Sequence, residues 1–271
     1  MIDFMQIMGL PLAACLVLTG IHAYLGLHVI QRQVIFVDLA LSQIAVLGTS
    51  CGFLLGLDLD HPLSYALSLG FTVAGAALFA MSRFRRQLVP QEAIIGIIYV
   101  VASSLTVILL GFSGEGTEHI RQFLIGNILL VGWRDVIKIL SLYTGVGLLH
   151  YFCRHKFFLI TNDPQRAFQK GLNVRLWDFL FYMSFGVVVT SSVKMAGVLL
   201  VFSFLVIPAV CAMILADRLR SRLLIGWVMG TLGSLLGMIV SYFADLPTGA
   251  AVVCIFGTLL LIVALVRPRA V

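Results

Sequence analysis

The sequence predicts an all-α integral membrane protein with eight to nine transmembrane helices, in a single domain over residues 1–271. Hydrophobic residues make up 61% of the chain, charged residues only 11%, and the mean hydropathy is +1.07. Soluble domains are less apolar than this. The apolar runs are about 20 residues long, as a membrane-spanning helix requires, and they lack the alternating pattern of a membrane barrel.

Breaks that contain charged residues separate nine apolar runs. The first run is too long for a cleaved signal peptide and contains His22 and His28, so we interpret it as a true span. In chain order, the predicted spans are 8–30, 34–57, 62–82, 93–112, 136–153, 177–193, 196–216, 223–242 and 248–266. Glycines recur at three- or four-residue spacing in the eighth span, which predicts close helix packing; they are Gly226, Gly230, Gly233 and Gly237.

Basic residues gather in alternate gaps between the spans, with the largest groups at 83–86, 154–175 and 218–222. Cytoplasmic loops carry an excess of lysine and arginine, so these gaps are predicted to face the cytoplasm. The N-terminus then lies outside and the C-terminus inside. The net charge of +6 reports this membrane orientation, and no nucleic-acid partner is expected.

No motif in the sequence predicts an enzyme. The chain has no GxxxxGK[ST] phosphate-binding loop, so ATP hydrolysis is not expected in it, and it has no HExxH or GxSxG motif. Its five cysteines are scattered without a CxxC pair, which argues against a disulfide framework or a metal cluster. We therefore expect no cofactor bound in this chain.

The long outer gap, 112–135, contains an apolar stretch, RQFLIGNILLVGW, that is short for a full crossing. This length favours a re-entrant or interfacial helix, with a break at Gly126 and Asn127.

The long inner gap, 154–177, contains the signals of a short helix. Asp163 is placed to cap its first turn, Pro164 suits the first helical position, and Gly171 is placed to stop it. A short, basic, capped helix at the cytoplasmic face is typical of a docking element. An ordinary solvated loop is the alternative interpretation.

Four stretches resemble, in order and position, motifs of the permease subunits of zinc and manganese ABC importers. They are QFLIGNILLV, NDPQRAFQKGLNV, SSVKMAGVLLVFSFLVIPAVCA and SYFADLPTG. The resemblance implies a helical fold similar to vitamin-B12-type importers, a homodimer in the bacterial inner membrane, and separate ATPase subunits at its cytoplasmic face. It also implies an outer solute-binding protein that delivers a divalent metal ion as substrate. In the inner loop, Asp163, Ala167 and Gly171 match the acid, alanine and glycine of the ATPase-coupling helix.

The second span departs from that family pattern. Family members carry an aspartate and a histidine four residues apart, followed by a glycine; aligning Gly48 with this glycine places Leu39 and Gln43 at those positions. Without the histidine, zinc and manganese both stay open as substrates.

Three polar residues of the second span are the predicted translocation path. Asp38 and Ser42 are four residues apart and share a helix face, an oxygen pair suited to hydrated cations, so Asp38 is a candidate metal ligand. Gln43 lies about 140° around the helix from Asp38. The alternatives are that Asp38 reaches the membrane interface or pairs with Arg32, and that Gln43 makes a helix-to-helix hydrogen bond.

Two outer turns could collect a cation at the entrance, or bind basic residues of a delivery protein. One carries Asp60 and His61, the other Glu118 and His119. Outer loops are often acidic without such a role, which is the alternative here.

Three classes of function fit these observations. The first is the permease subunit of an ABC importer for a divalent metal ion. The second is a self-contained secondary transporter or channel, in which Asp38 would relay protons or ions. The third, a membrane enzyme or scaffold, is disfavoured by the absence of catalytic motifs. Only the first needs an ATPase-docking helix at the inner face.

Overall fold

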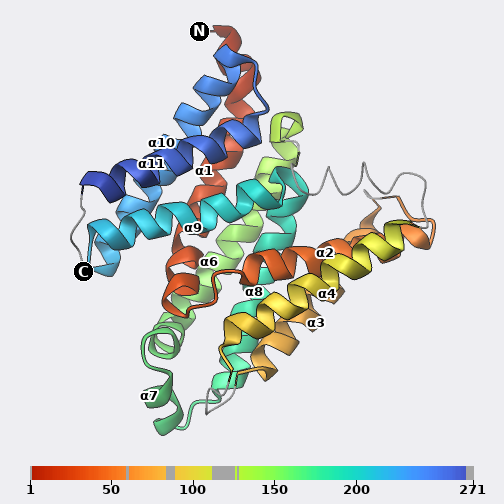
Figure 1. Cartoon of the computed structure of the whole chain (residues 1–271), viewed down its shortest axis with the longest axis vertical. Helices are drawn as coiled ribbons and strands as arrows, with labels where there is room; N and C mark the ends of the chain where they lie inside the picture. Colours follow the sequence, from red (N-terminus) through yellow and green to blue (C-terminus); the bar gives the residue numbers. More distant parts are fainter. Residues whose placement is uncertain (1, 59–60, 84–88, 112–125, 127, 267–271) are drawn as a thin grey trace. The chain divides into compact units, whose positions relative to one another are not determined.

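The computed structural model describes residues 2–58, 61–83, 89–111, 126 and 128–266. All regular secondary structure in these ranges is helical (Figure 1). The elements are α1 (Ile2–Gln31), α2 (Val37–Leu54), α3 (Pro62–Met81), α4 (Gln91–Gly111), η1 (Ile128–Leu130), α6 (Trp133–Asn162), α7 (Pro164–Gln169), α8 (Val174–Ala196), α9 (Val198–Leu215), α10 (Leu219–Ala244) and α11 (Thr248–Val266).

Nine helices within the described ranges are long and apolar enough to cross a membrane, which confirms the predicted all-α membrane architecture. Their bounds lie within a few residues of the predicted spans, except that α1 begins earlier, at Ile2, and α6 continues past residue 153 to Asn162. Arg154 and Lys156 lie exposed on this extension, and their charged groups stand over the rings of Tyr151 and Trp177. These charges therefore mark the end of the apolar run and not the end of the helix.

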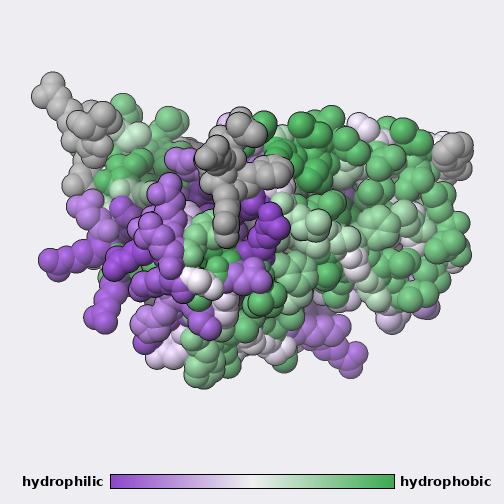
Figure 2. Space-filling model, turned by 90° about the horizontal axis from the view of Figure 1, so that it is seen from below, coloured by the Kyte–Doolittle hydropathy of each residue, from purple (hydrophilic) through white to green (hydrophobic). Residues whose placement is uncertain are grey.

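Large apolar side chains are exposed on several of these helices. On α4, the side chains of Ile97, Val100, Val101 and Ile108 are all more than half exposed. Figure 2 shows a broad hydrophobic surface, with most of the hydrophilic side chains gathered together and a smaller group apart from them. Soluble monomers rarely expose apolar patches of this kind, so the surface fits a lipid environment.

The chain forms two compact units. Unit 1 consists of Met1–Ile30, Leu124–Gly147 and Ser192–Val271, and unit 2 of Gln31–Phe123 and Leu148–Ser191. The long helices α1, α6 and α8 contribute residues to both units.

In unit 1, the helices α9, α10 and α11 pack against one another (Figure 1). The four glycines of α10 lie where its neighbours approach: a Cβ added at the first two would contact α1, and one added at the last two would contact α11. The contacted residues are, in order along α10, Ala23, Thr19, Phe256 and Val252. The predicted close packing at these glycines is confirmed.

Helix α1 lies close against α9 at Gly26, where a Cβ would overlap with the backbone carbonyl of Leu205. We expect Gly26→Ala to lower the free energy of unfolding by roughly 3 kcal/mol, because a backbone atom cannot move aside as a side-chain end can. Gly20→Ala, on the same helix, is the matched control, since no atom lies within 4 Å of the added Cβ. Thermal unfolding in detergent measures both; equal melting temperatures would contradict the close contact.

The predicted outer helix between Arg121 and Trp133 lies partly outside the described residues. Gly126 has a positive φ of 65°, which is not helical, and η1 follows it as a single 3-10 turn. The backbone therefore departs from a regular α-helix at Gly126, as expected. A Cβ there would overlap with the backbone of Ala196 and Gly197, which ties this segment to the turn between α8 and α9.

In unit 2, α2 packs against both α3 and α4 (Figure 1). Gly48 lies against the backbone of α3, with Ser68 Cα 2.9 Å from an added Cβ, and the Ser68 hydroxyl donates to the Ala45 carbonyl at 2.8 Å. One turn further along the same face of α3, the Thr72 and Thr190 hydroxyls lie 3.0 Å apart and join α3 to α8. Helix α2 is thus held on a polar, small-residue seam.

Candidate functional site

Two carboxylates surround the first turn of α2. Glu92, from the start of α4, accepts a hydrogen bond from the Phe36 backbone N–H at 3.0 Å. Asp38 Oδ1 accepts from the Leu39 N–H at 2.7 Å. The N-terminus of a helix carries partial positive charge, so both carboxylates are favourably placed there.

The predicted path residues lie on two faces of α2, as the helical spacing predicts, and these faces differ in exposure. Asp38 and Ser42 are each only 1% exposed and lie on the buried face. Leu39, Gln43 and Leu47 are half-buried and follow one another at four-residue spacing on a different face. The structure therefore brings Asp38 and Ser42 to one face, and separates Gln43 from them.

The alternative partner for Asp38, Arg32, is engaged elsewhere. Its guanidinium forms a salt bridge with Asp178 of α8, with 2.9 Å between Nη1 and Oδ1. The predicted alternative of an Asp38–Arg32 pair is therefore wrong. The burial of Asp38 also leaves its carboxylate away from the exposed surface.

The inner helix α7 is built as its sequence predicts. Asp163 Oδ1 accepts from the Arg166 N–H at 2.9 Å, and Pro164 occupies the first turn. At the other end, the Gly171 N–H donates to Phe168 O and the Leu172 N–H donates to Ala167 O, which is the Schellman pattern. Gly171 has a φ of 73°, the left-handed conformation that this pattern requires.

Ala167 lies on the side of α7 that packs against the rest of the chain, and it is fully buried. It forms a hydrophobic cluster with Ile160 of α6 and Val174 of α8, and Leu172 and Trp177 pack around this cluster. The resemblance places Ala167 in an ATPase-coupling helix. In the structure, the Ala167 side chain packs α7 against α6 and α8 of the same chain. The face of α7 that is open to a partner carries Gln165, Arg166 and Gln169 instead.

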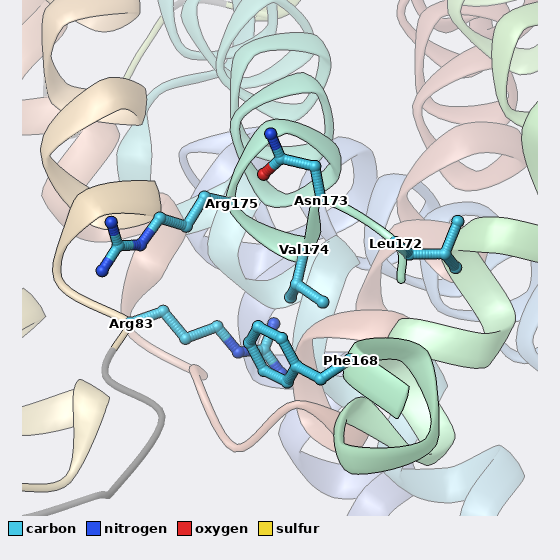
Figure 3. A pocket seen from close by; sticks show the side chains of 6 residues that line it. All are labelled: Arg83, Phe168, Leu172, Asn173, Val174 and Arg175. Carbon is cyan, nitrogen blue, oxygen red and sulfur yellow. The ribbon is translucent and has the colours of Figure 1, made fainter. Parts of the chain in front are cut away.

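A hollow of about 360 Å³ opens beside α7 (Figure 3). Its described lining combines apolar side chains with two arginines: Arg83, Phe168, Leu172, Asn173, Val174 and Arg175. Asn173 also caps α8, since its Oδ1 accepts from the Leu176 N–H at 3.2 Å. The hollow next to α7 is therefore lined by both apolar side chains and arginines, and Arg83 is one of the arginines that pair with Asp178.

Comparison with known proteins places the whole chain in one family. The sequence profile of the ABC 3 transport family matches residues 2–267. The chain belongs to this family. It is 25% identical over 251 residues to the manganese transport system membrane protein MntC of Listeria innocua, covering 92% of this chain and 86% of that protein. It is 28% identical to the high-affinity zinc uptake system membrane protein ZnuB of Haemophilus influenzae, covering 88% and 89%.

A solved structure has the same fold as this ABC 3 family chain. PsaBC from Streptococcus pneumoniae in complex with Fab aligns with a TM-score of 0.81 at 22% identity, over 98% of this chain and 95% of that chain. This similarity confirms the helical fold, and the family match together with the relatives confirms the resemblance to permeases of ABC importers.

The candidate entrance residues of this ABC 3 family chain are described only in part. Asp60, Glu118 and His119 lie outside the described residues. His61 caps α3, and its Nδ1 accepts from the Leu63 N–H at 3.2 Å. Within the described part of the chain, no group of three His, Cys, Asp or Glu side chains could hold a metal ion.

Sequence reasoning missed a buried ionic cluster in this family member. Asp178 of α8 pairs with Arg32 and also with Arg83, whose Nη1 lies 2.5 Å from Asp178 Oδ2. The available signal was a carboxylate just inside an apolar run, with arginines at the same predicted membrane face. The partners are 146 and 95 residues away in sequence, so local patterns could not pair them.

Proposed function

We propose that this chain is the membrane-spanning permease subunit of an ABC importer that moves a divalent metal ion, of the manganese or zinc class, into the cell. ATP hydrolysis takes place in a separate partner chain. The observation that carries this proposal is the family match over residues 2–267, together with relatives named for manganese and zinc transport. The capped helix α7 supports it, because a self-contained transporter or channel has no need of a docking helix.

The proposed assembly is a homodimer of permease subunits, each a single transmembrane domain, in the bacterial inner membrane. The ATP-binding subunit docks at the cytoplasmic face against α7, with Asp163, Ala167 and Gly171 shaping that helix. An outer solute-binding protein delivers the ion on the opposite face.

In this assembly α2 lines the translocation path through Asp38, Ser42 and Gln43. Asp38 supplies the negative charge that attracts a cation, and the burial of Asp38 and Ser42 keeps their oxygens away from lipid. At the outer entrance, Asp60, His61, Glu118 and His119 collect the ion. The metal is the substrate and not a resident cofactor.

Reconstitution tests this function directly. The chain is incorporated into liposomes with its cognate ATPase and solute-binding protein, and uptake of Mn²⁺ and Zn²⁺ is measured by elemental analysis. We expect uptake that requires ATP and both partners. Ion movement by the chain alone, without the ATPase, would instead support the secondary-transporter or channel alternative.

The orientation gives a second test. Single cysteines at Gln169 and Arg220 are expected to react with an impermeant thiol reagent only from the cytoplasmic side, and one at Asp245 only from outside. All three positions are exposed, so access depends on the membrane face alone. The unsubstituted chain, with its five natural cysteines, is the blank. Labelling of all three positions from one side would overturn the predicted orientation.

A further inference from the structure

Asp178 is the centre of a buried ionic cluster in unit 2. Its carboxylate is fully buried, and its two oxygens accept from Arg32 at 2.9 Å and from Arg83 at 2.5 Å. Arg32 lies between α1 and α2, and Arg83 follows the end of α3. One side chain of α8 therefore holds both the connection that leads into α2 and the end of α3.

Arg32 is fixed by more than this salt bridge. Its Nε donates to the Thr161 hydroxyl of α6 at 2.9 Å, and its guanidinium stands 3.9 Å above the ring centre of Phe181. The side chain is only 2% exposed. A cation held in this way cannot move away from α8 without leaving charges unpaired in a buried environment.

The same face of α8 continues in both directions from Asp178. Val174, four residues earlier, packs with Ala167 of α7. Tyr182, four residues later, has its hydroxyl 3.2 Å from Gln91 Nε2 at the start of α4. Residues at four-residue spacing share a helix face, so this face contacts α7, then the α1–α2 connection and α3, then α4.

We propose that Asp178 is a coupling residue, which transmits displacement of α7 to the inner ends of α2, α3 and α4. The proposal rests on the proposed function, in which α7 receives the ATPase. Apolar contacts between helices are not directional and let side chains slide, whereas buried charge pairs with fixed hydrogen-bond geometry hold their partners in place. Arg83 also lines the hollow beside α7, next to the proposed docking surface (Figure 3).

Asp178 acts through other residues, so it is a positioning residue and need not touch the ion. A purely structural role predicts that its loss lowers stability, ATPase binding and transport in parallel. Coupling predicts a distinct result, in which the complex assembles and hydrolyses ATP while fewer ions cross for each ATP.

The test uses the chain reconstituted with its ATPase, and measures Mn²⁺ uptake per ATP hydrolysed, affinity for the ATPase, and melting temperature. We expect Asp178→Asn to lower uptake per ATP about tenfold, a change within the range that coupling substitutions produce, with ATPase affinity retained. Asp135→Asn is the matched control, because Asp135 forms an exposed ion pair with Lys138 on α6 and should leave the ratio unchanged.

A second variant covers the case in which Asp178→Asn does not fold. The triple substitution Arg32→Met, Asp178→Leu and Arg83→Met replaces the buried charges by apolar side chains, an exchange that proteins often tolerate. We expect this variant to assemble with the ATPase and to show the same loss of uptake per ATP. An unchanged ratio in the assembled complex, or parallel loss of ATPase affinity and uptake, would overturn the proposal.

A readout that does not depend on the transported ion separates this proposal from the proposed function. A cysteine at Leu47, on the half-buried face of α2, is labelled in the presence of ATP or ADP, with the unsubstituted chain as blank. If the parent complex moves neither Mn²⁺ nor Zn²⁺, the proposed function fails. If nucleotide alters labelling equally with and without Asp178→Asn, the coupling proposal fails.

Discussion

Ala167→Glu is expected to abolish ATP-driven transport while the chain still inserts into the membrane. The substitution buries a methylene and a carboxylate in the cluster of Ala167, Ile160 and Val174, where no cation is part of the cluster. An uncompensated buried charge costs roughly 3–5 kcal/mol. Detachment of α7 from the ends of α6 and α8 exposes the carboxylate to water and relieves that cost, so we expect α7 to detach from these two helices. Binding of the ATPase, measured by co-purification and by titration, should fall at least as much as transport.

Gln165→Glu is the matched control, since it adds the same carboxylate to the exposed face of α7. A hydrated surface charge should leave α7 seated, so we expect a much smaller loss of ATPase binding. Equal losses in the two variants would mean that charge at the docking face, and not the buried seat, decides the binding.

Helix α7 shows which structural features the sequence alone predicts and which it does not. Its caps depend on contacts within a few residues, from Asp163 to Arg166 and from Gly171 to Phe168, so the sequence pattern was sufficient. The burial of Ala167 depends on Ile160 and Val174, which reach it from two other helices. No local pattern distinguishes an alanine that faces a partner from one that faces its own chain.

The spans follow the same rule. An apolar run of bilayer length is a local property, so all nine candidate spans of the described residues were predicted. The end of α6 was placed too early because charge marks the edge of an apolar run, whereas backbone hydrogen bonding continues to Asn162. The pairing of Asp178 with Arg32 and Arg83 arises only from the tertiary fold.

The residues of the candidate path lie on two faces of α2, and the sequence predicted only part of this arrangement. The spacing argument predicted that Gln43 points away from Asp38, and their exposures agree. It could not predict which of the two faces is buried, because that depends on how α3 and α4 pack against α2. The half-buried face carries Leu39 and Gln43, the two positions that the resemblance aligns with a family ligand pair.

Asp38→Asn is expected to abolish transport while leaving the fold intact. The amide keeps the volume of the side chain and can still accept from the Leu39 N–H, but it loses the negative charge that attracts a cation. Uptake of Mn²⁺ by the reconstituted complex and the melting temperature measure the two parts of this expectation. Glu92→Gln is the control, because Glu92 also places a carboxylate at the start of α2 through its contact with Phe36. Transport retained in Asp38→Asn would show that the charge of Asp38 is not needed in the path.

A second variant complements Asp38→Asn by adding a pair of metal ligands to the half-buried face of α2. Leu39→Asp with Gln43→His places a carboxylate and an imidazole four residues apart, so both can reach one ion from the same face. Imidazole is a far better zinc ligand than an amide, and we expect the double variant to bind Zn²⁺ or Mn²⁺ about tenfold more tightly than the parent. Titration of the purified chain, with elemental analysis of the bound ion, measures this affinity. If the parent already binds either ion as tightly, its ligands come from other helices, and the weight placed on Asp38 is wrong. If only the double variant binds tightly, the parent path passes its ion with weak oxygen contacts, as Asp38 and Ser42 would provide.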